Sequence, residues 1–308
     1  MKRHLVRATV AIGALLVWAA LPPAASADSR RSANQAPPQT GYVGAEACVT
    51  CHEGFDSSVN RTKHAFAKDP RTPFAQQGCE SCHGPGEAHV NDPAKVRPKN
   101  FTKMAAKEVS ETCASCHNRS QHVFWEGSQH DARNVTCTNC HVVHRPKTEK
   151  GLLRAASQTE TCAACHRDKA NKIDRSGHMP VREGKMQCSS CHNPHGSKNV
   201  RLLKAGFTIN ESCTSCHTEK RGPFLWEHAP VRENCATCHD PHGSSNERML
   251  VAKNPFLCQR CHVHARHPAT IYDAAVLSTS NRVFGRACAT CHSQIHGSNH
   301  PSGNFLVR

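Results

Sequence analysis

The sequence predicts a chain of short helices and loops, with little or no β-sheet, wrapped around an interior that side chains alone do not fill. Of the 308 residues, 20 are cysteine and 24 are histidine, whereas aromatic residues make up only 5%. The hydrophobic fraction of 37% counts the cysteines and still falls below the roughly 45–50% that is usual for globular domains. No convincing run of alternating apolar and polar residues predicts strands. This composition therefore disfavours a large doubly wound enzyme or a β-sandwich packed only by side chains.

The N-terminal residues have the pattern of a secretion signal. Basic residues precede an apolar run at residues 8–21, and small residues favour cleavage after Ala27. The apolar run is shorter than the roughly 20 residues of a spanning helix, so we expect residues 1–27 to be removed on export. Residues 28–41 are polar and contain proline, which predicts a mobile segment. The remaining residues, 42–308, form the predicted functional domain.

Every cysteine belongs to one of ten copies of the pattern C-x-x-C-H. This pattern is the attachment signature of c-type haem, in which two thiols bond the porphyrin and the following histidine lies under the iron. We therefore predict ten covalently bound haem c groups, with each motif histidine as one iron ligand. The ten motifs are Cys48, Cys51 and His52; Cys79, Cys82 and His83; Cys113, Cys116 and His117; Cys137, Cys140 and His141; Cys162, Cys165 and His166; Cys188, Cys191 and His192; Cys213, Cys216 and His217; Cys235, Cys238 and His239; Cys258, Cys261 and His262; and Cys288, Cys291 and His292.

Other uses of the cysteines account for the pattern less well. An exported chain rich in cysteine suggests disulfides, but disulfides require neither regular C-x-x-C spacing nor a following histidine. Zinc sites built from paired motifs would leave ten histidines without a role.

Bound haem also changes what the net charge of the chain implies. Without the three Lys and Arg residues of the leader, the formal net charge falls from +15 to +12. Twenty haem propionates would then bring it near −8, so the basic composition does not indicate nucleic-acid binding.

The second axial ligand of each iron is predicted to be histidine. Four methionines remain after the leader and cannot serve ten haems, whereas thirteen histidines lie outside the motifs and the leader. The motifs form five repeat units of two, which begin at Cys48, Cys113, Cys162, Cys213 and Cys258. An early histidine follows the first motif of the first four units, and a late histidine follows the second motif of all five. The predicted ligands are His64, His130, His178 and His228 (early), His89, His144, His195, His242 and His296 (late), and His267 in the fifth unit.

The fifth unit leaves a choice open. His264 and His267 both follow its first motif, and we favour His267 because Pro268 fixes the backbone and a helix-like stretch follows. His122 and His300 are left over and are expected to be surface or supporting residues. Two imidazoles per iron close its coordination sphere, which is typical of electron carriers and leaves no position for a substrate. We therefore expect no catalytic residues and no enzyme activity.

The motif spacing also predicts the organisation of the domain. Motifs recur too closely for a separate fold around each haem, so the haems should pack on one another as a linear array inside an elongated chain. The fold class is thus a multihaem cytochrome c. Two pentahaem halves with a border near residues 170–185 are one reading of this domain. Residues 103–112 and 159–167 are expected to form short helices.

Ten motifs, an export signal and the repeated phrases NPHGSKN, DPHGSSN and QIHGSNH together resemble the periplasmic decahaem cytochromes of the MtrA/DmsE type. The resemblance covers the chain after the leader. It implies that the cytochrome lies in the periplasm and is held inside an outer-membrane β-barrel porin, where it carries electrons across the membrane. It also implies a periplasmic electron carrier on one side and an outer-surface multihaem cytochrome, reductase or mineral on the other, as in metal respiration or iron oxidation.

Two alternatives to a conduit remain. A free periplasmic electron shuttle would have nearly the same sequence. A multihaem reductase would need at least one open iron position, and the chain has enough histidines to close all ten.

Overall fold

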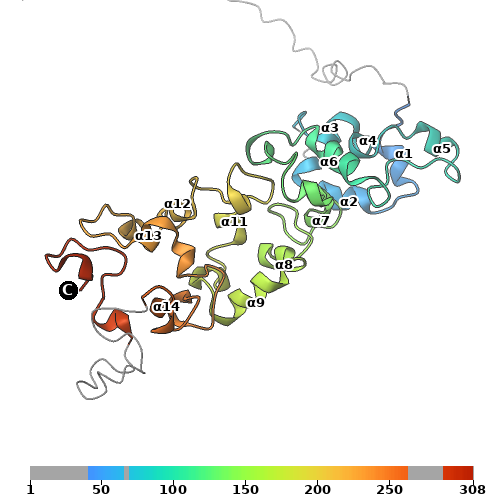
Figure 1. Ribbon diagram of the computed structural model, residues 1–308. Coiled ribbons are helices and arrows are strands. Elements are labelled where there is room, and N and C mark those ends of the chain that lie inside the picture. Colours follow the sequence, from blue (N-terminus) through green and yellow to red (C-terminus); the bar gives the residue numbers. More distant parts are fainter. Residues whose placement is uncertain (1–40, 66–68, 263–286, 308) are drawn as a thin grey trace, which may run out of the picture. The chain divides into compact units, whose positions relative to one another are not determined.

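The computed structural model describes residues 41–65, 69–262 and 287–307 (Figure 1). The predicted signal at 1–27, nearly all of the segment at 28–41, and the choice between His264 and His267 lie outside these ranges. In the described part, short helices are joined by long loops, and the longest helix, α9, has ten residues. This architecture confirms the prediction of short helices and loops.

The α-helices in chain order are α1 (Ala45–Val49), α2 (Phe55–Asn60), α3 (Pro73–Gln77), α4 (Glu80–His83), α5 (Glu87–Asn91), α6 (Ala106–Ala114), α7 (Cys137–Cys140), α8 (Gln158–Ala163), α9 (Arg167–Ser176), α10 (Met179–Arg182), α11 (Cys188–Cys191), α12 (Ile209–Thr214), α13 (Ala229–Glu233) and α14 (Phe256–Gln259). Single 3₁₀ turns lie between them: η1 (Lys63–Ala65), η2 (Ser120–His122), η3 (Asp131–Arg133), η4 (Val200–Leu202), η5 (Thr218–Lys220), η6 (Cys235–Thr237), η7 (Glu247–Met249), η8 (Cys288–Thr290) and η9 (Gly303–Phe305).

Local sequence explains where several helices begin. Helix α8 starts after Ser157, whose hydroxyl accepts a hydrogen bond from the backbone N–H of Glu160 at 3.1 Å. Thr208 caps α12 in the same way through the N–H of Glu211 at 3.2 Å. These are the serine or threonine caps that stabilise a helix start.

The two helices expected from the sequence differ in their boundaries. Helix α6 begins three residues later than expected and extends to Ala114. The expected helix at 159–167 is two helices, because α8 ends at Ala163 and α9 begins at Arg167. The break falls within the fifth motif, where His166 has non-helical backbone angles and precedes α9.

Backbone pairing between neighbouring segments is limited to isolated bridges in the described residues. Three of them join a motif histidine to a leucine eleven or twelve positions later: His141 with Leu153, His192 with Leu203, and His239 with Leu250. A fourth joins Trp226 to Ser298. The near absence of β-sheet agrees with the sequence prediction.

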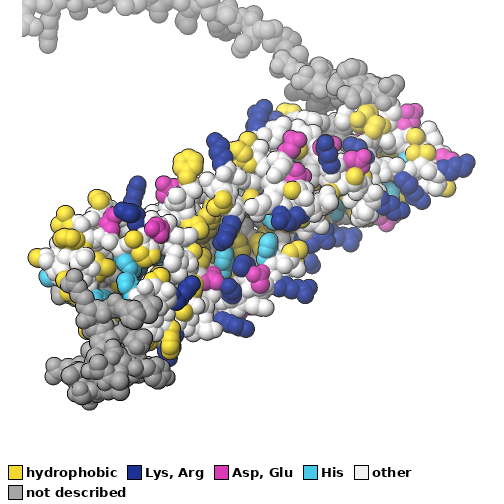
Figure 2. Space-filling model, viewed as in Figure 1, with side chains coloured by type: hydrophobic (Ala, Val, Ile, Leu, Met, Phe, Trp, Pro, Cys, Tyr) yellow, Lys and Arg dark blue, Asp and Glu magenta, His cyan; other side chains and the backbone are white. Residues whose placement is uncertain are grey.

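The described residues contain almost no conventional core. The buried hydrophobic side chains are Ala65, Val109, Ile173 and Leu306, and Val109 is the one that is almost fully enclosed. Figure 2 shows Lys and Arg side chains spread over the visible face of the molecule, with histidines exposed in its hollows. Side-chain packing alone would stabilise such a chain poorly, because apolar burial is the dominant favourable term in folding. Among the described helices, none has the length and apolar character needed to cross a membrane.

Candidate haem-binding site

All ten C-x-x-C-H motifs adopt the same backbone turn. In each, the backbone N–H of the motif histidine donates a hydrogen bond to the carbonyl of the first cysteine, at 2.9–3.1 Å. The position of the flanking helix, however, alternates between odd-numbered and even-numbered motifs. In odd-numbered motifs the helix ends one residue after the first cysteine, as α1 ends at Val49 and α8 at Ala163. In even-numbered motifs the helix or 3₁₀ turn begins at the first cysteine or the residue after it, as α7 and α11 do.

Thiols of consecutive motifs lie beside one another in sequence order. The first cysteines meet within each repeat unit: Cys48 with Cys79, Cys113 with Cys137, Cys162 with Cys188, Cys213 with Cys235, and Cys258 with Cys288. The second cysteines are near enough between units to interact electrostatically, without a hydrogen bond: Cys82 with Cys116, Cys140 with Cys165, Cys191 with Cys216, and Cys238 with Cys261. These nine neighbouring thiol pairs connect the first motif to the tenth without a gap.

The same contacts appear in the acidity of the free thiols. Burial and then the adjacent Cys79 thiol raise the pKa of Cys48 to about 11. Burial likewise raises the pKa of Cys82, with Cys116 as the next contribution. A raised pKa keeps these two thiols protonated and weakly nucleophilic near neutral pH. In two units the pair is unequal, because the hydrogen bond from the partner thiol lowers the pKa of Cys137 to about 7 and that of Cys188 to about 6.

Nine of the ten predicted non-motif histidines lie opposite a motif histidine. Their ring centroids are 5.9–6.3 Å apart: His52–His89 (6.3 Å), His64–His117 (5.9 Å), His83–His144 (6.3 Å), His130–His166 (6.2 Å), His141–His195 (5.9 Å), His178–His217 (6.1 Å), His192–His242 (6.1 Å), His228–His262 (6.0 Å) and His239–His296 (6.1 Å). The tenth predicted ligand, His267, lies outside the described residues.

This spacing fits two imidazoles that share one metal ion. A metal–nitrogen bond to histidine takes about 2 Å on each side, and the two ring radii account for the rest. No group of three or more His, Cys, Asp or Glu side chains that could hold a metal ion occurs among the described residues. Two protein ligands per metal are what a porphyrin requires, because its four nitrogens fill the other positions.

Most of the pairs join different repeat units. His64 of the first unit faces His117 of the second, and His144 of the second faces His83 of the first. The same exchange recurs between each unit and the next along the described chain. The first motif is the exception, because His52 faces His89 of its own unit. Each pair therefore closes a long loop of chain, and its formation is coupled to the packing of neighbouring units.

Backbone carbonyls hold the motif histidines of all five even-numbered motifs. Their Nδ1–H groups donate to the carbonyls of Lys99 (from His83, 2.9 Å), Gly151 (from His141, 2.5 Å), Arg201 (from His192, 2.9 Å), Arg248 (from His239, 2.9 Å) and Phe305 (from His292, 2.6 Å). Such a bond fixes the ring so that Nε2 is the free nitrogen, as metal-binding histidines require.

Unusual backbone conformations aim two of these carbonyls. Arg201 and Arg248 have φ values of 56° and 55°, in the left-handed region that side chains other than glycine seldom adopt. The following residues, Leu202 and Met249, are also left-handed. Strained backbone of this kind often marks a functional position, and here it turns the carbonyl toward a motif histidine.

Other groups that contact the non-motif histidines are not evident from motif patterns. The Nδ1 of His89 donates to the Val96 carbonyl at 2.8 Å, and that of His130 to the Pro194 carbonyl at 2.8 Å. The hydroxyl of Ser58 lies 3.3 Å from Nδ1 of His144. The carboxylate of Asp240 lies 3.4 Å from Nδ1 of His242. Only the last had a sequence signal, namely the aspartate in DPHGS where the sister repeat has asparagine.

Burial keeps several of the non-motif histidines neutral. It is the main cause that lowers the pKa of His64, His178 and His228. For His195, burial and then the nearby His122 lower the pKa to about 4. The neutral ring is the form that binds a metal, so these side chains need lose no proton to do so.

His122 lies in an unexpected place. Its ring centroid is 4.3 Å from that of His195 and 5.6 Å from that of His117. The first distance is shorter than those of the nine pairs. His122 therefore lies beside two candidate ligands of neighbouring motifs. His300 lies in a C-terminal loop, where its Nδ1 accepts from the N–H of Ser302 at 3.1 Å.

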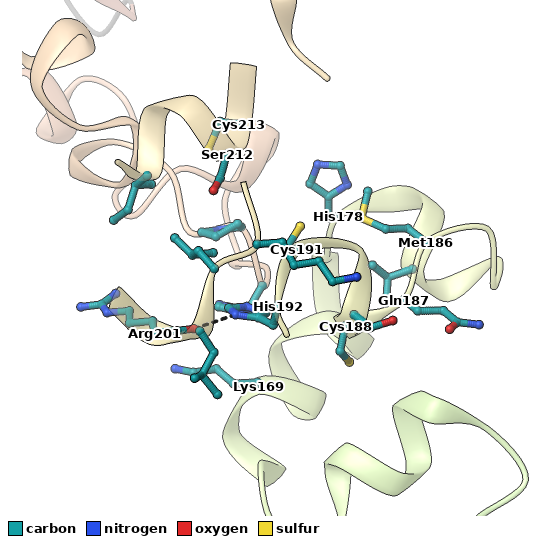
Figure 3. Close-up of a pocket in the computed structure, with 18 of the residues that line it drawn as sticks. Lys169, His178, Met186, Gln187, Cys188, Cys191, His192, Arg201, Ser212 and Cys213 are labelled. Atoms are coloured by element: carbon teal, nitrogen blue, oxygen red, sulfur yellow. Dashed lines mark hydrogen bonds between the residues drawn. The ribbon is translucent and has the colours of Figure 1, made fainter. Parts of the chain in front are cut away.

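A single large cavity brings the third to tenth motifs together. Its volume is about 4080 Å³, several times that of ordinary ligand pockets of about 300–1,000 Å³. Cysteines and histidines of these eight motifs line it, along with basic residues such as Lys169 and Arg201. Figure 3 shows the part around α11, where Cys188, Cys191 and His192 lie near His178 and Cys213. Prosthetic groups of porphyrin size account for such a space, and the basic residues are suited to pair with propionates.

The attachment turns, the paired histidines and the continuous cavity define the class of the protein as a multihaem c-type cytochrome. The chain is 45% identical over 276 residues to the multihaem cytochrome MtrA of Shewanella baltica, which covers 86% of this chain and 81% of that protein. The chain belongs to the MtrA family of multihaem cytochromes. It is an electron-transfer protein with about ten covalently bound haem c groups.

Further similarities cover parts of the chain. The doubled CXXCH motif matches residues 178–222 and 228–267, and the NrfB-like cytochrome c family matches residues 79–153. The C-type polyhaem cytochrome OmcB of Geobacter sulfurreducens is 27% identical over 250 residues, but this chain spans only 31% of its length. The cytochrome c-type protein NrfB of Escherichia coli is 29% identical over 125 residues, covering 40% of this chain and 65% of that protein.

Proposed function

We propose that the chain carries electrons across the outer membrane inside a β-barrel porin, between periplasmic carriers and an extracellular acceptor or donor. The observation that carries this proposal is the unbroken succession of nine neighbouring thiol pairs from the first motif to the tenth. A chain that holds its motifs in sequence order can accept an electron near one end of the described domain and deliver it near the other.

In this proposal each motif histidine and its partner across about 6 Å are the two axial ligands of one iron. The early and late histidines supply nine partners, and His267 supplies the tenth. With both positions filled by imidazole, the iron supplies one-electron chemistry without a site for substrate. The protein is accordingly a redox carrier that lacks catalytic residues.

The chain's own residues orient the ligands and limit water. The Arg201 and Arg248 carbonyls hold the rings of His192 and His239, so that the ligand geometry does not depend on redox state. Burial of the partner histidines keeps a low dielectric around the site, which reduces the solvent reorganisation that a change of charge would cause. These features favour fast electron transfer.

We assign the protein to the periplasm, associated with the outer membrane through its porin, after export directed by residues 1–27. A barrel wall would cover apolar side chains such as Phe207, which is 84% exposed, and Leu225, which is 76% exposed. A periplasmic electron carrier and an outer-surface multihaem cytochrome are the proposed neighbours at the two ends, and nucleic acid is not a partner.

Native isolation tests this proposal. A tagged copy of the full chain, expressed in its own host, is extracted from membranes in mild detergent and its partners are identified by mass spectrometry. We expect a β-barrel porin in about equal amount and a protein with only low-spin iron by EPR. Recovery as a soluble periplasmic monomer without a porin would refute the conduit and favour the free shuttle. A substantial high-spin signal would instead favour a multihaem reductase.

A further inference from the structure

We propose that Asp240 is a positioning residue that lowers the reduction potential of the haem at the sixth motif, where His192 and His242 face each other, below that of the haem at the fourth motif. The inference rests on the proposed axial pairs. It concerns how one member of the array is made more strongly reducing than another, which haem attachment alone does not determine.

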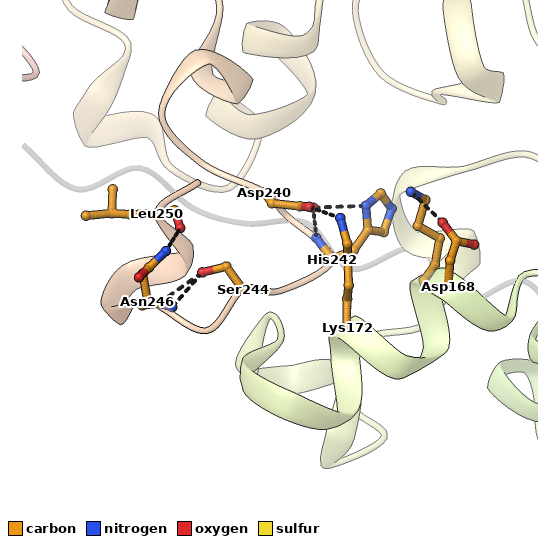
Figure 4. Close-up of polar contacts among 8 residues, drawn as sticks. Asp168, Lys172, Asp240, His242, Ser244, Asn246 and Leu250 are labelled. Carbon is orange, nitrogen blue, oxygen red and sulfur yellow. Dashed lines mark hydrogen bonds and ion pairs between the residues drawn. The ribbon is translucent and has the colours of Figure 1, made fainter. Parts of the chain in front are cut away.

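Asp240 makes contacts on two sides, as Figure 4 shows. Its Oδ1 lies 3.4 Å from Nδ1 of His242 and accepts the backbone N–H of the same residue at 3.0 Å. Its Oδ2 accepts a hydrogen bond from Nζ of Lys172, on α9, at 2.6 Å. The Asp240 side chain is 21% exposed, so solvent screens these contacts only in part. The carboxylate is thus the nearest charge to the outer nitrogen of the His242 ring.

The repeats provide an internal comparison. Asn193 occupies the position of Asp240 in the preceding unit, directly after the motif histidine. Its backbone N–H donates to the Leu202 carbonyl at 2.7 Å, as that of Asp240 donates to the Met249 carbonyl at 2.8 Å. Its Oδ1 accepts the N–H of His195 at 3.2 Å. The backbone role is the same, but Asn193 carries no charge, and Nδ1 of His195 is buried without a hydrogen-bond partner. Val142 and Gln294 hold the equivalent places in two other units and are also uncharged.

A carboxylate beside Nδ1–H makes an imidazole a stronger donor to the metal on its other nitrogen. A stronger donor and a nearby negative charge both favour the oxidised metal, which is the more positive of the two states. Lys172 opposes this effect in part by neutralising the carboxylate. Lys169, on the same helix as Lys172, pairs with Asp168 at 2.9 Å, and its positive charge also opposes that of Asp240 at the His242 ring. Asp240 therefore sets the sign of the effect and Lys172 limits its size.

Potentiometric titration of the full haem-loaded chain, followed by EPR of the low-spin signals, tests the proposal. In Asp240→Asn we expect one component in ten to become about tenfold more reduced at a fixed potential, which is a positive shift of about 59 mV for a one-electron couple. In Lys172→Gln the same component should shift in the opposite direction. Asn193→Asp should shift a different component to lower potential, because it introduces the carboxylate at the fourth motif.

Asp168→Asn is the matched control. It removes a carboxylate from α9, the helix that carries Lys172, and Asp168 does not contact a ligand. Equal shifts in this variant and in Asp240→Asn would overturn the proposal, as would unchanged potentials or shifts of the same sign for Asp240→Asn and Lys172→Gln. A purely structural role for Asp240 predicts shifts of the same sign in Asp240→Asn and Lys172→Gln. High-spin iron in the unmodified protein would instead contradict the axial pairs, so failure of the proposed function is distinguishable from failure of this inference.

Discussion

Glu80 provides a prediction whose magnitude follows from its contacts. This residue lies inside the second motif, is 4% exposed, and accepts backbone N–H groups from both sides of the first repeat unit. Its oxygens accept from Val43 (3.1 and 3.2 Å), Gly44 (2.9 Å) and Gly86 (2.7 Å). The side chain therefore joins the segment before the first motif to the segment after the second.

Replacement of Glu80 by Gln leaves one oxygen for three donors and turns an NH₂ group toward at least one of them. One or two buried N–H groups then lose their acceptor, at about 1–3 kcal/mol each. We expect a local destabilisation of about 3 kcal/mol, which corresponds to roughly 150-fold faster amide exchange at residues 43–44 and 86.

Hydrogen exchange by mass spectrometry on the haem-loaded protein measures this change directly. Glu87→Gln is the control, because Glu87 is an exposed carboxylate in the same region. Its exchange should stay within about twofold of the unmodified protein. Unchanged protection of residues 43–44 and 86 in Glu80→Gln would refute the reasoning, because it would mean that the three hydrogen bonds do not hold the unit together.

Three further outcomes are expected. In His228→Ala, about one tenth of the iron should become high-spin by EPR, because His228 faces a motif histidine at 6.0 Å. Added imidazole should restore the low-spin signal. His300→Ala should change neither the high-spin nor the low-spin signal. Joint replacement of Cys137 and Cys140 by alanine should leave nine haems by pyridine haemochrome assay and slow end-to-end reduction in stopped flow; an unchanged rate would contradict the sequential order. Replacement of Arg201 by Gly should raise stability to denaturant by about 1 kcal/mol, since its φ of 56° favours glycine, and a loss of stability would count against strain at this turn.

Much of the site was predictable because haem attachment is encoded locally. Two cysteines and a histidine within five residues define each motif, and the same backbone turn follows in all ten. The early and late histidines were also predictable from their spacing, and the structure brings nine of them opposite a motif histidine. The sparse core followed from composition, since too few apolar residues were present to build one.

The pairing between units could not be predicted from spacing. His64 is close in sequence to the first motif, yet it faces the histidine of the third. Similarly, the contact of Pro194 with His130 joins residues 64 positions apart. Such contacts depend on how neighbouring units pack, which is a tertiary property. The role of Glu80 was missed for the same reason, because its partners are backbone groups of other segments. Asp240 lies two residues from His242 in the DPHGS phrase, but its second partner, Lys172, comes from another segment.

The alternation of thiol contacts limits how such a protein can change in length. First cysteines meet within a unit and second cysteines meet across the junction to the next, so the two kinds of contact take turns along the chain. Loss of a single motif would place unlike edges against each other at the junction where it was lost, because its two neighbours would meet through a first cysteine on one side and a second cysteine on the other. Removal or insertion of two motifs would preserve the order. Shorter and longer versions of this array should therefore arise by duplication or deletion of whole doublets, which keeps the total even.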